Sequence, residues 1–258
     1  MSTPPPAPPA PPAPPNNLVG VALLAAFAAA GWGLAHGTAV GPLTFVFIML
    51  GWGLSVMAHE FGHALTAYAG GDHTVRAKGY LAFDPRRYGD LGTSIILPLL
   101  ILALGGIGFP GGAVYLRDDL MRGPVCRAAA ALAGPFATLL VLLLLAVVLR
   151  TWSAFDTTNP LYPALTFLAF LQSTALILNL LPLPGLDGFG VIRPFLPDPY
   201  APWLRRAEGL AIAVLFVLVF VTPWAGAFLF GTGARIIFAL GLSPEALNEG
   251  FRNFRFWR

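Results

Sequence analysis

Residues 42–70 read PLTFVFIMLGWGLSVMAHEFGHALTAYAG, and this stretch decides how the chain is built. It is apolar for about four helical turns and then places His59, Glu60 and His63 in the same segment. A charged carboxylate at membrane depth costs about 2.5–3.5 kcal/mol, and such groups usually face a cavity or a partner. The stretch therefore predicts a membrane helix that carries a functional site.

The five residues His59-Glu60-Phe61-Gly62-His63 follow the H-E-x-x-H pattern. Positions i and i+4 lie on one face of a helix, so both imidazoles can bind one metal ion. Glu60 is turned from them by about 100° and is placed to reach a water molecule on the metal. We expect zinc-bound water to attack, with Glu60 as general base and later as general acid. The alternative is a pair of core histidines beside a chance glutamate.

The composition excludes a water-soluble globule. The chain has 258 residues, of which 57% are hydrophobic and 10% charged, whereas soluble domains carry about 25% charged residues. Since about 20 apolar residues cross a bilayer, we expect an all-α polytopic membrane protein with about six transmembrane helices. The net charge of +3 is spread over short loops, which indicates orientation in a lipid bilayer rather than nucleic-acid binding. The single Cys126 excludes an intrachain disulfide framework.

The apolar segments outline the domain organisation. We expect a Pro-rich disordered tail at 1–17, a membrane-embedded domain at 18–242, and an interfacial aromatic and basic tail at 243–258. The sequence leaves open whether the last apolar segment, 224–242, spans the membrane or lies at its surface. The candidate segments are 18–36, 42–69, 92–109, 127–150, 161–181, 207–221 and 224–242.

A catalytic zinc usually takes three protein ligands and keeps one position open. His36, His73 and the few acids near membrane depth are candidates for the third ligand, and the best is Asp187 in ILNLLPLPGLDGFG (177–190). The prolines in this stretch cannot continue a helix, and an opened helix at membrane depth is tolerated only where it lines a cavity or is buried in protein. The alternative for Asp187 is a helix N-cap or an interfacial acid.

The depth of these groups constrains the topology. The two histidines and Asp187 lie toward the C-terminal ends of their segments, so the two helices must run in the same direction to meet. That requires segment 92–109 to enter the membrane and return on the same side. The positive-inside tendency agrees, because three basic clusters then face the cytoplasm together. These clusters are Arg76, Lys78, Arg86 and Arg87; Arg117, Arg122 and Arg127; and Arg193, Arg205 and Arg206.

Three motifs in this order carry a family resemblance. They are His59–His63, Ala133-Gly134-Pro135, and Asn179-x-x-Pro182-x-x-x-Leu186-Asp187-Gly188. Together they resemble the site-2 protease family of intramembrane zinc metalloproteases, and the likeness covers about residues 42–242. The chain looks like the minimal bacterial-type branch, which lacks a PDZ or CBS domain.

The resemblance implies an endopeptidase that cleaves within or near the membrane. It implies one zinc ion per chain, held by His59, His63 and Asp187, with Glu60 activating water. Asn179 would act at the substrate carbonyl or its developing oxyanion. The substrates would be transmembrane or membrane-associated proteins. The protein would lie in a bacterial inner membrane, with its active site toward the cytoplasm.

The resemblance also implies a small β element beside the active site. A strand near 111–114 would pair with substrate backbone, which an unwound peptide needs in place of its helical hydrogen bonds. The chain departs from the family pattern at three places, one of which is the loop at Gly111, which lacks the Lys-Pro-containing continuation of many relatives. Thr138 follows where the family usually has an asparagine, and Phe189 stands where a second glycine is common. The metal-binding residues are intact.

Two other functions are compatible with the same residues. One is a catalytically inactive relative that binds membrane proteins as a scaffold, although the intact H-E-x-x-H set argues against it. The other is a metal transporter, which should have a polar path through several helices, whereas the metal-binding groups here form one cluster. The oligomeric state is not predicted.

Overall fold

A computed structural model describes residues 17–88, 96–105, 114–152, 156–197, 210–211, 214–215, 217–219 and 221–258. All regular structure within these ranges is helical. This confirms an all-α polytopic membrane protein. Residues 1–16 of the Pro-rich tail, residues 207–209, 212–213, 216 and 220 of the candidate span 207–221, and residues 111–113 of the expected β element lie outside the described residues.

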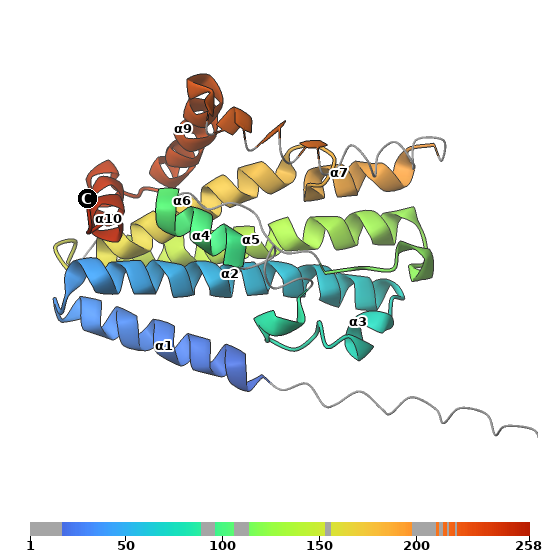
Figure 1. Cartoon of the computed structure of the whole chain (residues 1–258), viewed down its shortest axis with the longest axis horizontal. Coiled ribbons are helices and arrows are strands. Elements are labelled where there is room, and N and C mark those ends of the chain that lie inside the picture. Colours follow the sequence, from blue (N-terminus) through green and yellow to red (C-terminus); the bar gives the residue numbers. More distant parts are fainter. Residues whose placement is uncertain are drawn as a thin grey trace, which may run out of the picture.

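Four of the described helices are long and apolar enough to cross a membrane: α1 (Leu18–Ala35), α2 (Val40–Gly70), α5 (Pro124–Trp152) and α6 (Leu161–Leu180). Each falls on a segment that the sequence marks as apolar. Figure 1 shows that α2 and α6 run in the same direction, while α1 and α5 run in the opposite one. The shared direction of α2 and α6 is what a common site at their C-terminal ends requires.

Shorter helices connect and flank these spans. The helix α9 has 17 residues, which at about 1.5 Å per residue is shorter than the hydrocarbon core. The amphipathic helix α10 packs against α6, where Gly250 allows the two backbones to approach at Pro163. The remaining elements are α3 (Thr74–Ala77), η1 (Pro85–Arg87), α4 (Leu97–Gly105), η3 (Asp118–Leu120), α7 (Asp187–Ile192), η4 (Arg193–Phe195), α9 (Pro223–Ala239) and α10 (Pro244–Phe254).

The helix α4 does not cross the membrane. Its nine residues extend about 14 Å, roughly half of the hydrocarbon thickness. The chain before and after it lies at the same end of the bundle, because the Arg117 backbone N–H donates to Asp72 Oδ2 at 2.8 Å and Lys78 Nζ donates to the Tyr115 carbonyl at 2.6 Å. The described chain on either side of 89–113 therefore lies at one end of the bundle, which agrees with the expectation that segment 92–109 enters the membrane and returns.

The centre of the bundle is formed by α2, α5 and α6. The helix α6 is buried over most of its length, and Trp52, Phe167 and Leu171 belong to the core cluster around it. The helices α2 and α5 approach closely at Gly62, where a Cβ atom would lie 2.7 Å from the Ala133 carbonyl oxygen. This close approach occurs within the H-E-x-x-H stretch and brings α5 against the site.

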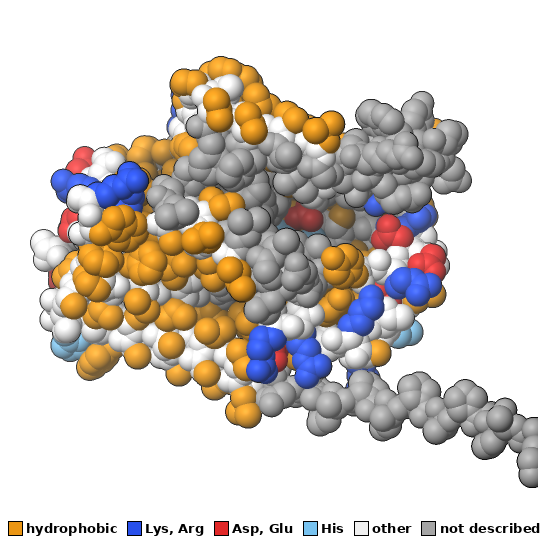
Figure 2. All heavy atoms as spheres, in the orientation of Figure 1, with side chains coloured by type: hydrophobic (Ala, Val, Ile, Leu, Met, Phe, Trp, Pro, Cys, Tyr) orange, Lys and Arg blue, Asp and Glu red, His pale blue; other side chains and the backbone are white. Residues whose placement is uncertain are grey.

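The outer surface of the bundle suits contact with lipid. Figure 2 shows hydrophobic side chains over the left part of one face and over its upper projection, while most Lys, Arg, Asp and Glu side chains lie at the upper left, along the lower edge and at the right. Large apolar side chains are exposed along α1 and α5. Their contact with water would be unfavourable, whereas contact with lipid would not. They include Leu18, Val21, Leu24 and Trp32 on α1 and Leu140, Leu144 and Val147 on α5.

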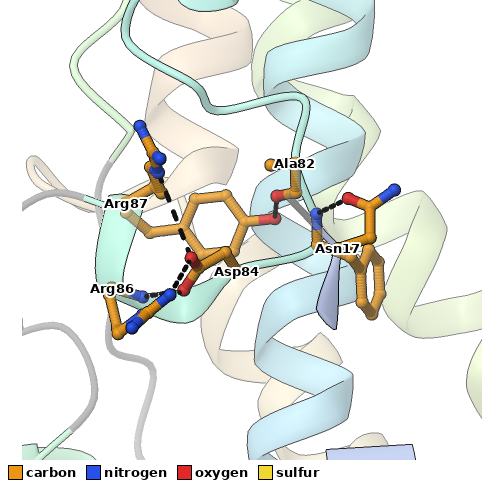
Figure 3. Close-up of polar contacts among 7 residues, drawn as sticks. Asn17, Ala82, Asp84, Arg86 and Arg87 are labelled. Carbon is orange, nitrogen blue, oxygen red and sulfur yellow. Dashed lines mark hydrogen bonds and ion pairs between the residues drawn. The ribbon is translucent and has the colours of Figure 1, made fainter. Parts of the chain in front are cut away.

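A buried acid organises the loop that follows α3. Asp84 is almost fully buried and accepts hydrogen bonds from Nε and Nη2 of Arg86 at 2.9 and 2.8 Å (Figure 3). The Tyr88 hydroxyl donates to the Ala82 carbonyl at 2.9 Å, and the Phe83 backbone N–H donates to Asn17 Oδ1. These contacts attach the loop to the start of α1.

We predict that Asp84→Asn destabilises the protein in a pH-dependent way. The hydrogen bonds from Arg86 hold the pKa of the Asp84 carboxyl below its ordinary value of 3.8. A lowered pKa in the folded state stabilises the fold above about pH 4. This stabilisation is lost as the pH falls through the pKa that the carboxyl has in the folded protein. The melting temperature of wild type should therefore exceed that of Asp84→Asn at pH 7, and the difference should shrink below pH 4.

The exposed Asp118 provides the control for this measurement. Asp118→Asn should leave the melting temperature unchanged over the same pH range, because that side chain lies on the surface. A wild-type advantage over Asp84→Asn that is absent at pH 7, or constant down to pH 3, would contradict the prediction.

Candidate metal centre

Two histidines of α2 and one aspartate at the start of α7 meet inside the bundle. His59 and His63 lie one turn apart on α2, are both buried, and have their Nε2 atoms 3.1 Å apart. Asp187 Oδ2 lies 3.1 Å from His59 Nε2, and Asp187 Oδ1 lies 3.3 Å from His63 Nε2. In the described part of the chain, these are the three residues whose ligand atoms gather within 4.8 Å of one another.

The end of α6 brings Asp187 to this point. The helix stops at Leu180, because the prolines that follow cannot continue it, and Gly185 takes a left-handed φ of 92°. The chain then turns sharply, and Asp187 begins α7. A Cβ atom on Gly188 would overlap the Leu180 carbonyl, so glycine allows the turn to fold back tightly on α6.

The helix α5 orients both histidines. His59 Nδ1 lies 2.9 Å from Thr138 Oγ1, and His63 Nδ1 lies 2.7 Å from the Ala130 carbonyl oxygen. A carbonyl can only accept, so His63 carries its proton on Nδ1, which leaves the Nε2 lone pair directed toward Asp187. The Thr138 hydroxyl can accept from His59 in the same way.

In the sequence, Thr138 stands out only as a departure from the family pattern. The structure shows that it contacts a candidate metal ligand. A signal was available, because Thr138 is the one residue with a polar side chain between positions 128 and 149. The Ala130 carbonyl contact had no such signal, since every residue has a carbonyl.

Gly134 on α5 leaves room for an ion between the histidines. A Cβ atom at this position would overlap His63 Nε2 and would lie 2.6 Å from His59 Nε2. The motif Ala133-Gly134-Pro135 therefore has a physical role that the sequence alone did not reveal. Any larger side chain there would fill the space in front of the two Nε2 atoms.

Glu60 lies beside this cluster without joining it. Its side chain is buried, and its Oε2 accepts a hydrogen bond of 3.1 Å from the Val114 backbone N–H. Glu60, the histidines and Asp187 line one cavity of about 320 Å³. A carboxylate in that position can exchange a proton with a molecule held in the cavity.

Asn179 lines the same cavity from α6. It is largely buried, and no described residue makes a hydrogen bond with its side chain amide. The amide can therefore donate to a ligand in the cavity.

The other two histidines lie elsewhere. His36 follows α1, and its Nδ1 is 2.8 Å from the carbonyl of its neighbour Trp32. His73 follows α2, and its ring packs edge-on against Tyr68 with the ring centroids 4.9 Å apart. Neither approaches the cluster, so Asp187 is the candidate third ligand that the structure brings to His59 and His63.

The donor set fits one zinc ion. Two imidazole nitrogens and a carboxylate are a ligand combination typical of catalytic zinc, in which three protein ligands leave a position open for water or substrate. Both Nδ1 atoms are occupied by α5, both Nε2 atoms face the carboxylate, and Gly134 keeps the space clear. The residues present could therefore hold the metal without rearranging the bundle.

We predict that Gly134→Ala lowers the zinc content of the purified protein to well below one ion per chain. The added methyl group would overlap the His63 ring nitrogen that faces the cluster. Gly53→Ala is the matched control, because a Cβ atom on this α2 glycine would meet nothing within 4 Å. Metal analysis of both variants checks the prediction, and full zinc occupancy in Gly134→Ala would contradict it.

Comparison with known proteins relates the chain to bacterial sequences that carry the name of zinc metalloproteases. No protein-family model matches it, and no solved structure matches it. It is 42% identical over 226 residues to "Putative zinc metalloprotease Rip2" of Mycobacterium tuberculosis (strain ATCC 25618 / H37Rv), which covers 86% of each chain. It is 39% identical over 245 residues to the protein of the same name in Mycolicibacterium smegmatis, covering 93% of this chain and 92% of that one.

A more distant relative carries a related name. The chain is 28% identical over 179 residues to "Putative zinc metalloprotease YwhC" of Bacillus subtilis (strain 168), covering 66% of this chain and 78% of the relative. The identity to the Rip2 sequences, over most of both chains, agrees with the motifs and with the His-His-Asp cluster. The chain belongs to the site-2 protease family of zinc metalloproteases.

Proposed function

We propose that this protein is an intramembrane zinc endopeptidase that hydrolyses peptide bonds of transmembrane or membrane-associated proteins. The observation that carries the proposal is the meeting of His59, His63 and Asp187 beside the buried carboxylate of Glu60, in a cavity between helices that can cross a membrane. This combination provides a metal site and an adjacent proton acceptor.

His59, His63 and Asp187 would hold one zinc ion per chain. When bound, the ion would supply Lewis-acid activation of a water molecule and of the substrate carbonyl. The contribution of α5 is to hold both imidazole rings in place through Thr138 and the Ala130 carbonyl. Such outer contacts fix the ring orientation and the position of the ring proton.

Glu60 would move the protons of the reaction. It sits next to His59 in sequence but is turned away from the ligand face of α2, so its carboxylate remains free of the metal. We propose that it accepts a proton from the attacking water and then donates that proton to the nitrogen of the leaving amine. The Val114 backbone N–H contacts one carboxylate oxygen, which leaves the other for this exchange.

Asn179 would act on the substrate. Its amide lines the cavity from the last turn of α6, eight residues before Asp187. We propose that the amide N–H donates to the carbonyl oxygen of the bond being cut, where negative charge develops during the attack.

The position of the site along α2 supports a substrate within the membrane. His59 is 11 residues from the C-terminal end of α2 at Gly70, a distance of about 16 Å along the helix. The hydrocarbon core is about 30 Å thick, and the 31 residues of α2 extend about 46 Å, so α2 projects beyond it. We propose that the core covers the apolar N-terminal part of α2 and includes the site. A transmembrane substrate reaches this depth, provided that it unwinds near the bond to be cut.

We predict that Glu60→Gln keeps its zinc but loses at least about 100-fold in cleavage rate. Asp187→Ala should lose zinc, because one of three ligands is removed. The probe is a synthetic single-span peptide with a central Gly-Pro break, placed in liposomes with the purified protein. Mass spectrometry measures cleavage, and metal analysis measures zinc.

The outcomes separate the rival functions. Equal cleavage by wild type and Glu60→Gln would refute the proposed mechanism. A wild-type protein that binds the peptide without cutting it would indicate a scaffold. Zinc uptake into the liposomes that His63→Ala abolishes would indicate a transporter.

We further propose that the site opens toward the cytoplasm of a bacterial cell. The basic loops that follow α2 and precede α5 lie at one end of the bundle, because the Arg122 backbone N–H bonds to the Gly70 carbonyl. The same end is the nearer one to His59. The positive-inside tendency assigns this end to the cytoplasmic side.

A pair of engineered cysteines tests the orientation. In a Cys126→Ser background, a cysteine replacing the exposed Arg76 should react with a membrane-impermeant maleimide only in inverted vesicles. A cysteine replacing the exposed Thr157, between α5 and α6, should react only in right-side-out vesicles. The reverse pattern would overturn the assignment.

A further inference from the structure

The cavity continues beyond the metal centre along α2 and α6. Trp52 lies seven residues before His59 on α2, and Gln172 lies seven residues before Asn179 on α6. Seven residues are about two helical turns, or 10 Å, so each pair shares a helix face. All four residues line the same cavity. Because α2 and α6 run in the same direction (Figure 1), Trp52 and Gln172 are displaced toward the same side of the centre.

Both residues carry a buried donor without a partner. Trp52 is 2% exposed and Gln172 is 1% exposed, and neither Trp52 Nε1 nor Gln172 Nε2 has a hydrogen-bond partner among the described residues. Leaving a buried donor unpaired costs about 1–3 kcal/mol, so native structures rarely do so without a reason. Two such donors on residues that line one cavity indicate a ligand with hydrogen-bond acceptors.

The polar neighbours of Gln172 on α6, in contrast, have hydrogen-bond partners. The Ser173 hydroxyl bonds to the carbonyls of Phe170 and Gly233, and the Thr174 hydroxyl bonds to the Leu171 carbonyl. These two side chains serve packing within α6 and against α9. Gln172 is the polar residue of this stretch that faces the cavity.

The chemistry of this part of the cavity favours a neutral acceptor. Apart from Glu60 and Asp187 at the centre, the charged residues that line the cavity are Asp118 of η3, Arg127 near the start of α5 and Arg193 of η4, at the other end of the site. The residues near Trp52 and Gln172 are Ser55, whose hydroxyl bonds to its own helix, and apolar side chains. A carboxylate would therefore lack a counter-charge there, whereas an amide carbonyl would not need one.

We propose that Trp52 and Gln172 form a subsite that donates hydrogen bonds to backbone carbonyl oxygens of the bound substrate. An extended peptide rises about 3.3 Å per residue, so 10 Å places these carbonyls roughly three residues from the bond that is cut. A helix that unwinds in the membrane exposes carbonyls that have lost their own partners, and the two donors replace those partners. This inference rests on the proposed proteolytic function and extends it to substrate positioning.

Binding to an inactive but metal-loaded protein tests the subsite. In the Glu60→Gln background, the synthetic peptide is held without being cut, and its dissociation constant can be measured in nanodiscs. Trp52→Phe and Gln172→Met each remove the donor and keep a similar volume. We expect each to raise the dissociation constant by about tenfold, as the loss of one hydrogen bond to a buried acceptor implies, with zinc content unchanged.

Thr44→Val is the matched control. Thr44 also lies on α2 and is fully buried, and its Oγ1 also lacks a partner among the described residues, but it does not line the cavity. Its replacement should leave peptide binding unchanged. A variant with β-(3-benzothienyl)alanine at position 52 keeps the ring shape and replaces the N–H with sulfur. Its dissociation constant for the peptide should rise by the amount expected for Trp52→Phe. It tests the loss of the N–H separately if the smaller phenylalanine ring impairs folding.

A change in the peptide identifies the acceptor as backbone. A thioamide in place of the amide weakens the acceptor, so at about three residues from the mapped cleavage position it should weaken binding to the Glu60→Gln protein. The same thioamide should have little further effect in the variant, Trp52→Phe or Gln172→Met, that lacks the donor to that carbonyl. Additive losses in both variants would overturn the proposal, since groups in direct contact are coupled and separate groups are not.

The remaining outcomes are distinguishable. Unchanged peptide binding in both donor variants would mean that the subsite holds water only, and would overturn this inference while leaving the proteolytic function intact. Loss of zinc in the donor variants would assign them a structural role and would also overturn it. If the parent protein neither binds nor cuts the peptide, both proposals fail.

Discussion

The structure depends on gathering ionisable side chains at one point within an apolar bundle. His59, His63 and Asp187 would each be costly if they faced lipid, and they become acceptable because they face one another. The histidines lie near the C-terminal third of α2, and the acid follows the C-terminus of α6. The two helices must therefore run in the same direction, and the chain between them must cross the membrane once. The short α4 and the single crossing of α5 follow from that requirement.

The helix α5 provides none of the candidate ligands, yet it determines how well they are placed. It supplies the contacts to both Nδ1 atoms, and its Gly134 leaves the space in which an ion would sit. The close approach at Gly62 is what allows these contacts, because a side chain there would push α5 away from the histidines. Orientation of a ligand through its second nitrogen commonly changes metal affinity by about 10- to 100-fold. The α2–α5 contact therefore belongs to the functional part of the fold.

Much of this could be predicted from the sequence, for identifiable reasons. Long apolar runs fix the spans, the i and i+4 spacing fixes a shared helix face, and the prolines around Asp187 mark where α6 opens. The contact from the Ala130 carbonyl could not be predicted, because a backbone acceptor has no sequence signature. The unpaired donors of Trp52 and Gln172 could not be predicted either. An apolar helix shows which residues are buried, but only the packing of three helices shows which of its faces borders a cavity.

The polarity of the cavity changes along its length, and this has a consequence for recognition. Charged residues lie toward the end formed by η3 and η4, whereas the opposite part offers neutral donors. Neutral donors that bind backbone carbonyls would stabilise any unwound segment, whatever its side chains. Selection among substrates would then depend on how readily a transmembrane helix unwinds near the bond to be cut, since a stable helix keeps its carbonyls paired. On this argument the protein would discriminate by local helix stability more than by a sequence motif.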